Sequence, residues 1–459
     1  MIRSDFQIYT KNSFARTPEE RPMTSSPVDS APAHNDRDPD NPADREYDPV
    51  DISPKSFWAK SARERDIAFA ELRRRAPVSW QRPVESDLAP SEITGFWAVT
   101  SHELIREVST HPEIFCSGGG IQLEDVPDEF LEAASSFLAM DGQRHLTYRR
   151  LMSGSFTPRQ VKRIEDQIRD RAATIVDEFL TKGSGDWVEN VAKQMPMNTI
   201  YEMAGLPVEK RDEAAHFADE LAGWNDPDIA AGRSSAEVLN DALVGNLGIG
   251  LEFAETTRTC PRDDIWSNLV TSTVDGHELD DDELASMFVL MSFAGNDTTR
   301  TTLSLGVKAF VDNPDQTAYL LEDFEGRIDA AIDEVLRWVT PVMTFRRTAT
   351  QDTVLGGRQI RKGDWVVMIY SSGNRDESEF PDPWTFDISR KPNQHVAFGG
   401  GGPHYCLGAF LAKMQLKHML DQILHRLPEL RFGEPDMLVS NFAAAVKTMH
   451  AEARCPVGH

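Results

Sequence analysis

The chain has 459 residues, with 48 Lys or Arg against 74 Asp or Glu, so its formal net charge is −26. A surface this acidic repels nucleic-acid phosphates and anionic lipids, which argues against nucleic acid or a membrane surface as a partner. With 40% hydrophobic and 27% charged residues the composition is that of a globular protein, and no apolar run approaches the roughly 18–20 residues of a membrane span.

The first stretch of the chain differs in composition from the rest. Residues 1–45 are rich in Pro, Asp and Asn, and such a segment buries too little apolar surface to offset the entropy lost on folding. It also lacks the apolar core of a secretory signal. We expect a flexible tail over residues 1–45 and a single domain over residues 46–459, in the cytoplasm.

Apolar residues recur at helical spacing through most of this domain. The helices predicted in chain order span 55–76, 158–182, 280–312, 326–340 and 406–427. Alternating apolar residues and turn signals predict a strand over 95–100 and short strands between 353 and 370. The pattern predicts a mainly α-helical fold with small β-sheets, in the α+β class.

The predicted helix over 280–312 is about 50 Å long, and residues 284–294 are apolar nearly all round, so it should be buried. Its centre reads AGNDTT over 294–299, where Gly weakens the helix and a buried acid is costly unless it is paired or used. Two interpretations stay open. The segment is either a kink with a satisfied polar cluster, or an opening that lines a reactive pocket with an acid, Asp297, and a hydroxyl, Thr298.

A second unusual segment is HVAFGGGGPHYCLG over 395–408. Four glycines without Cβ atoms allow the backbone to approach a flat ligand, and Cys406 then opens a helix whose dipole predicts a lowered pKa for the thiol. The other cysteines have no metal-binding spacing, and we expect them to be incidental. A thiolate iron ligand facing a buried acid–alcohol pair is what haem oxygen chemistry requires.

Further motifs occur in the same order as in a known family. His145 and Arg149 form a His-x-x-x-Arg pair, Glu334 and Arg337 form Glu-x-x-Arg, and Arg390 follows in FDISR. Together with the long helix and the cysteine loop, residues 50–459 resemble the cytochrome P-450 haem-thiolate monooxygenases. The resemblance implies the fold of that family, with haem b between the long helix and the helix after the cysteine.

The resemblance also implies a role for each matching residue. Cys406 is the axial ligand of the iron, and Asp297 and Thr298 are the catalytic residues that deliver protons to dioxygen. Glu334, Arg337 and Arg390 form a structural network. The other residues expected to hold the haem are His145, Arg149, Arg347, Phe398, Gly402, His404 and Gly408.

One difference from the general family pattern indicates a particular subgroup. Phe398 stands eight residues before Cys406, where the general family pattern has seven, because the loop contains one more glycine. This longer loop, with AGNDTTR and SSGNRD, is similar to a bacterial subgroup that acts on steroid side chains and branched lipids. We therefore expect hydroxylation of a steroid, terpenoid or branched lipid in an apolar pocket lined by Ile121, Leu123, Phe293, Ala294, Val342, Met343, Phe442 and Val446.

The resemblance implies a monomer that takes two electrons from a separate ferredoxin and ferredoxin reductase, since we find no fused electron-transfer domain. Because ferredoxins are usually acidic, a basic docking face is expected on the thiolate side. Its candidates are Arg144, Arg150, Arg159, Lys162, Arg163, Lys413 and Lys417. Two alternatives stay open: peroxide-driven oxidation by the same haem, and a non-catalytic haem-binding sensor or carrier. The Asp297–Thr298 pair favours dioxygen.

Overall fold

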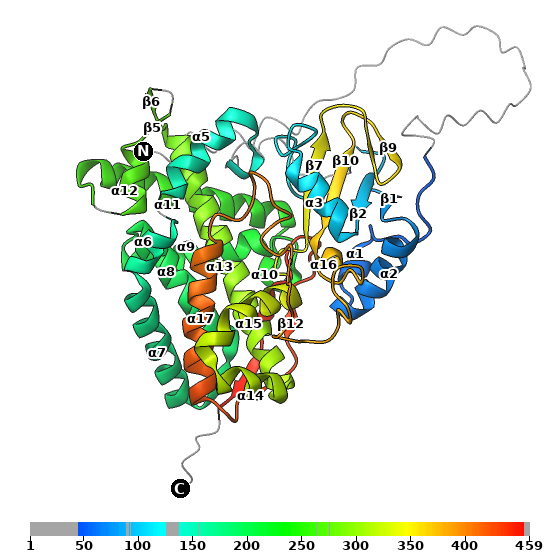
Figure 1. The fold of residues 1–459 in the computed structure, drawn as a ribbon. Helices are drawn as coiled ribbons and strands as arrows, with labels where there is room; N and C mark the ends of the chain where they lie inside the picture. The colour runs from blue at the N-terminus through cyan, green and yellow to red at the C-terminus, as the bar shows by residue number, and fades with distance from the viewer. Residues whose placement is uncertain are drawn as a thin grey trace, which may run out of the picture. The chain divides into compact units, whose positions relative to one another are not determined.

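The computed structural model describes residues 45–88, 91, 93–124, 137–154, 156–262, 264–274 and 276–453. The tail expected over 1–45 lies outside these residues, apart from Arg45. From Arg45 onward the described residues belong to one compact unit (Figure 1). No helix among them is long and apolar enough to cross a membrane.

The unit is rich in helices, as predicted. In chain order they are α1 (Lys55–Trp58), α2 (Ala62–Arg75), α3 (His102–Thr110), η4 (Phe137–Ala139), α5 (Gly142–Ser153), α6 (Pro158–Arg163), α7 (Glu165–Lys182), the π-helix η5 (Val188–Ala192), α8 (Gln194–Ala204), α9 (Val208–Ala222), α10 (Pro227–Ala230), α11 (Ser235–Thr259), α12 (Ile265–Val270), α13 (Asp281–Asp312), α14 (Pro314–Glu322), α15 (Phe324–Val339), α16 (Tyr370–Gly373) and α17 (Ala409–Arg426).

The strands are short. They are β1 (Val78–Gln81), β2 (Phe96–Val99), β3 (Phe115–Cys116), β4 (Ser184–Asp186), β5 (Thr273–Val274), β6 (His277–Glu278), β7 (Thr344–Ala349), β8 (Thr353–Leu355), β9 (Arg358–Ile360), β10 (Trp365–Ile369), β11 (Arg431–Phe432), β12 (Asp436–Met437), β13 (Val446–Thr448) and β14 (His450–Glu452). The largest sheet has the order β1-β2-β10-β7-β3 and is antiparallel except where β2 meets β10. It lies on the right in Figure 1.

Two predicted helices are each divided in the structure. The helix expected over 55–76 breaks after Trp58, because Ser61 caps α2 in a reciprocal capping box with Glu64. The helix expected over 158–182 breaks at Ile164, whose backbone leaves helical geometry between α6 and α7. The strand over 95–100 and the strands between 353 and 370 are present as β2, β8, β9 and β10.

The long helix α13 passes through the interior. Its N-terminus is closed by a capping box between Asp280 and Glu283. Its first half packs with α5, α8, α11 and α12 in one hydrophobic cluster, and its last turns pack with α7, α15 and α17 in another. The segment between these clusters, around residue 298, is where the helix lines open space rather than core.

Candidate active site

Two adjoining cavities meet at the middle of α13. The cysteine cavity, which Cys406, Phe398 and Arg347 help to line, measures about 1520 Å³ including its open ends. The apolar pocket measures about 1300 Å³ on the same basis. The residues that line both are Leu138, Leu290, Ala294, Thr298, Pro341, Val342 and Phe345. The thiol and the apolar pocket are therefore separated by a shared wall that includes Ala294 and Thr298.

The cysteine loop fixes Cys406 at the start of α17. Its backbone N–H donates to the carbonyl of Phe398 at 2.9 Å, which closes the loop. Cys406 faces the cavity, and desolvation by the surrounding protein raises the pKa of its thiol. The amides of Gly408 and Ala409 act in the opposite direction, as the helix dipole predicts, but desolvation is the larger effect.

The glycine run contacts a helix more than it contacts the cavity. A Cβ on Gly402 would lie 2.3 Å from the carbonyl oxygen of Ser109 in α3, and its φ of +74° disfavours any other residue. A Cβ on Gly400 would lie 2.9 Å from the Cβ of Ser109. Of the four glycines only Gly399 lines the cysteine cavity. The prediction that Gly402 contacts the ligand therefore needs correction, since it seats the loop on α3.

Positively charged and imidazole side chains converge on one part of the cysteine cavity. His145 of α5 stacks on His404 of the loop, with ring centroids 4.1 Å apart. Arg149, one turn along α5, donates to the carbonyl of Tyr405, while Arg347 reaches the cavity from β7. Neither arginine has an ion-pair partner among the described residues. Three segments of the chain, α5, β7 and the cysteine loop, thus direct basic groups into one place.

These groups are poorly solvated and repel one another. Burial lowers the pKa of His145 and of Arg347, and burial together with Arg347, His145 and Arg149 lowers the pKa of His404 to about 3. The Nε2 atom of His145 is buried and has no hydrogen-bond partner within the part of the chain that the structure describes. This part of the cavity therefore needs an anionic ligand to satisfy it.

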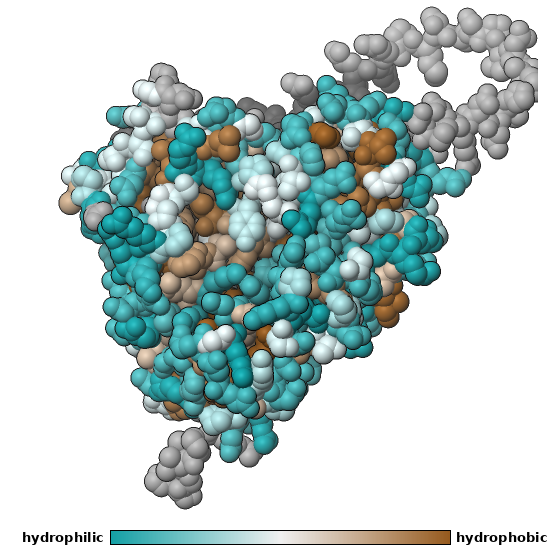
Figure 2. Space-filling model, viewed as in Figure 1, coloured by the Kyte–Doolittle hydropathy of each residue, from teal (hydrophilic) through white to brown (hydrophobic). Residues whose placement is uncertain are grey.

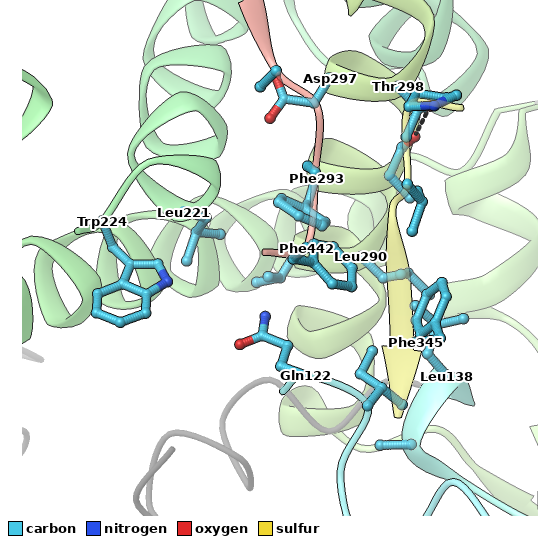
Figure 3. A pocket seen from close by; sticks show the side chains of 18 of the residues that line it. Gln122, Leu138, Leu221, Trp224, Leu290, Phe293, Asp297, Thr298, Phe345 and Phe442 are labelled. Carbon is cyan, nitrogen blue, oxygen red and sulfur yellow. Dashed lines mark hydrogen bonds between the residues drawn. The ribbon is translucent and has the colours of Figure 1, made fainter. Parts of the chain in front are cut away.

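Thr298 lies at the wall shared by the two cavities, and Asp297 lines the apolar pocket beside it. The helix continues through 294–299 without a break, and the Thr298 hydroxyl donates to the carbonyl of Ala294 at 3.0 Å. The helix backbone therefore does not open here, and the cavities lie between side chains. Gly295 packs closely against Ile200 of α8 at the same level of the helix. Figure 3 shows Asp297 and Thr298 at the edge of the apolar pocket.

An ion-pair chain leads from Asp297 toward the surface. One carboxylate oxygen contacts Arg300, which donates to Asp219 of α9 at 2.6 Å. Lys193 lies 3.1 Å from the other oxygen of Asp219 and 3.4 Å from the exposed Glu189. The second oxygen of Asp297 is buried without a hydrogen-bond partner. Arg300 is a residue that the sequence analysis missed, although its i+3 spacing from Asp297 was a usable signal.

The Glu334–Arg337 pair lies away from both cavities. Both side chains are fully buried, and Arg337 donates two hydrogen bonds of 2.7 Å to the carboxylate of Glu334. Arg390 lies 3.4 Å from the same carboxylate, and Asn393 donates to it at 3.0 Å. Arg337 also donates to backbone carbonyls after β10. This network ties α15 to the segment that precedes the cysteine loop.

The apolar pocket contains only some of the residues predicted for it. Ile121, Phe293, Ala294, Val342 and Phe442 line it. Leu123, Met343 and Val446 do not, because their side chains are at most 2% exposed within hydrophobic clusters. The structure corrects these three predictions, because each of the side chains packs into a hydrophobic cluster and not toward the pocket. Gln122 and Trp224 also line the pocket, although the sequence did not predict either of them.

The sequence and fold resemble those of known proteins. The family model for cytochrome P-450 matches residues 254–432. A methyl-branched lipid omega-hydroxylase of Mycobacterium tuberculosis is 37% identical over 406 residues, which cover 87% of this chain and 94% of the relative. The chain belongs to the cytochrome P-450 family.

Other relatives agree with this assignment. A steroid C26-monooxygenase of Rhodococcus jostii is 36% identical over 404 residues, covering 85% of this chain and 83% of the relative. A Mycobacterium marinum cytochrome P-450 solved in complex with pseudoionone is 48% identical, has a TM-score of 0.87, and is matched over 89% of this chain and 99% of its own. The predicted fold and enzyme class are confirmed.

The family and fold imply a cysteine-ligated haem, and the cysteine cavity fits one. Arg149, Arg347 and the unpartnered His145 supply the positive charge and hydrogen-bond donor that two propionates require. Gly408 lines the cavity, and a Cβ there would project into open space. Cys406 would supply the thiolate. Phe398 also lines the cavity and carries the carbonyl that holds the Cys406 amide.

Proposed function

We propose that this cytochrome P-450 hydroxylates a hydrophobic substrate, a branched lipid, terpenoid or steroid, with dioxygen and two electrons from a separate ferredoxin and its reductase. The observation that carries the proposal is the apolar pocket, which shares a wall with the cysteine cavity at Ala294 and Thr298. The relatives named for lipid and steroid oxidation support the substrate class.

Each group in the site has a task in this reaction. Bound haem supplies oxygen activation at an iron held by the Cys406 thiolate. Phe293, Val342 and Phe442 exclude water and hold a hydrocarbon chain. Thr298 places a hydroxyl at the boundary of the two cavities, where it can hold or pass a proton. One carboxylate oxygen of Asp297 is paired with Arg300, and the other is available to accept a proton.

The surface beside the cysteine loop supports a protein partner that delivers electrons. Figure 2 shows apolar side chains gathered over α5 and the N-terminal end of α17, and Leu146, Tyr405 and Phe410 are exposed. Arg150, Arg159 and Arg163 are exposed around them, without ion-pair partners among the described residues. The other expected docking cations each lie near an acid: Arg144 near Glu283, Lys162 near Glu165, Lys413 near Asp333 and Lys417 near Glu325. We therefore assign docking to the three unpaired arginines.

Replacing Thr298 by Ala tests the role of its hydroxyl. With reconstituted ferredoxin and reductase, we expect the yield of hydroxylated product per electron pair to fall at least about fivefold, while hydrogen peroxide release rises. Thr299→Ala is the matched control, because Thr299 lines the cysteine cavity but not the apolar pocket. Tight coupling in Thr298→Ala, or equal losses in both variants, would contradict the proposal. Full turnover on peroxide alone would favour the peroxide-driven alternative.

A further inference from the structure

The apolar pocket is almost free of polar groups and has no cation. Among the described residues its polar lining is confined to Gln122, Asp297, Thr298 and Thr301, and no Lys, Arg or His lines it. Asp297 carries a negative charge and is already paired with Arg300. Asp297, Thr298 and Thr301 all belong to α13. Among the described residues, Gln122 is therefore the one polar side chain that lines the pocket from another part of the chain.

Gln122 lies at the end of the pocket away from the cysteine. It lines the apolar pocket but not the cysteine cavity, and Leu221 and Trp224 share this property. Figure 3 shows Leu221 and Trp224 on the side opposite Phe345 and Leu138, which line both cavities, and the Gln122 amide between the two sides, at the end away from Thr298. The Gln122 amide has no hydrogen-bond partner among the described residues. It is placed to meet the end of a substrate that points away from Thr298.

The surroundings of that end are acidic. A small neighbouring cavity is lined by Glu124, Glu85 and Asp87, and its one cation, Lys55, lies 2.7 Å from Asp87. Glu124 follows Gln122 closely in the chain, and burial raises its pKa to about 7. A carboxylate on a ligand in the apolar pocket would also be desolvated, and it would find no cation among the described residues that line the pocket.

We infer that the substrate enters with an uncharged hydrogen-bonding group, a hydroxyl or carbonyl, held by the Gln122 amide, and that the pocket discriminates against the corresponding carboxylate. The inference rests on the proposed function and specifies its substrate. An amide donates to a carbonyl and accepts from a hydroxyl, so it binds either. It cannot neutralise a carboxylate, and a buried anion without a cation is strongly disfavoured. The reacting end is then the hydrocarbon terminus near Thr298.

Head-group preference can be measured with one carbon skeleton. Farnesol, methyl farnesoate, farnesoic acid and the hydrocarbon farnesane are titrated into the haem-containing enzyme at pH 8, and dissociation constants are read from the low-to-high-spin absorbance change. We expect farnesol and methyl farnesoate to bind at least about tenfold more tightly than farnesoic acid, because only the acid brings an unpaired charge.

Substitutions at Gln122 test whether its amide is the anchor. Gln122→Met keeps an unbranched side chain, and should weaken farnesol and methyl farnesoate by about three- to tenfold, as expected for one hydrogen bond, without changing farnesane. Gln122→Lys should strengthen farnesoic acid relative to farnesol. Leu221→Met, at the same end of the pocket, is the control and should change all four ligands alike.

The outcomes separate the inference from the proposed function. Equal affinity of the acid and the alcohol for the unmodified enzyme overturns the inference alone, provided that both are hydroxylated. A Gln122→Met variant that weakens farnesane as much as farnesol also overturns it, since the residue would then act only through packing. If none of the four compounds binds or is hydroxylated, the proposed function fails together with the inference.

Discussion

The cysteine cavity is built around single residues whose charge the protein leaves unbalanced. Arg149 and Arg347 have no carboxylate partner among the described residues, and His145 and His404 are stacked and held neutral by burial. The two propionates of a haem would balance this positive charge, so Arg149 and Arg347 would contribute to haem affinity through charge-assisted hydrogen bonds.

Glu124 is the opposite case, a buried acid near the outer end of the apolar pocket. Its pKa rises from 4.5 to about 7, mainly through burial, while a 3.1 Å hydrogen bond from Asn441 opposes the rise. Because the folded state holds this proton more tightly than the unfolded state, stability falls as pH rises from about 4.5 to 7 and is then level. At a conversion of about 1.36 kcal/mol per pKa unit, the loss is of order 3 kcal/mol at most.

Glu124→Gln tests this linkage. At pH 8 the variant should be more stable than the parent, and at pH 5 the difference should shrink, because the parent carboxyl is then largely protonated. Thermal unfolding of both haem-containing proteins across pH 5 to 8 measures it. Glu85→Gln, at an exposed position nearby, is the control and should show little pH-dependent difference. A Glu124→Gln effect that is independent of pH would exclude the linkage.

Among the elements, the glycine loop and α13 do most to position the site. Gly400 and Gly402 let the loop lie against α3, and Gly408 leaves open space at the cavity wall. The glycine run and Gly408 therefore serve two different purposes. Within the run, Gly400 and Gly402 pack against Ser109 of α3, whereas the sequence analysis expected these glycines to face the ligand.

This division predicts different effects for two glycine substitutions. Gly402→Ala forces a Cβ to within 2.3 Å of the Ser109 carbonyl at a positive φ, and should lower the stability of the haem-free protein by about 1–3 kcal/mol. Gly408→Ala meets nothing within 4 Å, so it should leave the haem-free protein unchanged but weaken haem incorporation. Circular dichroism melts of haem-free protein and haem titrations separate the two. The opposite pattern would show that Gly402, not Gly408, limits haem binding.

On the scale of the whole molecule, the net charge of −26 opposes docking of an acidic electron donor. The proposed docking face is a local basic area beside the cysteine loop. It is formed by α5, which contacts the loop through Arg149, and by α6, which packs on α17. Arg150, Arg159 and Arg163 project from α5 and α6 with no acid to neutralise them among the described residues. These arginines are exposed, so dissolved salt should screen their attraction for an acidic partner. Docking at this small basic area should therefore depend strongly on salt concentration.

Reversing Arg163 to Glu should raise the ferredoxin concentration needed for half-maximal turnover by about tenfold at low salt, and by much less at high salt. The measurement is turnover against ferredoxin concentration at two ionic strengths. Lys417→Glu is the matched control on the same side, because Glu325 already lies 2.7 Å from Lys417. An equal effect of the two substitutions, or one that is insensitive to salt, would exclude the assignment of docking to the unpaired arginines.

The sequence by itself determined the fold class, the enzyme family and the residues that act through fixed local spacing. Cys406 before a helix, Asp297 next to Thr298, and Glu334 three residues before Arg337 share one loop or helix, where the backbone sets their relation. Length and periodicity likewise predicted α13, because a long apolar helix has few alternatives to burial.

Only the tertiary structure decided which distant residues meet and how their charges respond. His145, Arg347 and His404 come from α5, β7 and the cysteine loop. The family resemblance named all three, but their spacing in the chain does not give the stacking of His145 on His404 or the position of Arg347 beside the cavity. Leu123, Met343 and Val446 differ from the true pocket residues only in the direction of their side chains. The pKa values of Cys406 and Glu124 follow from desolvation, which sums over all the surrounding protein and has no counterpart in the spacing of residues along the chain.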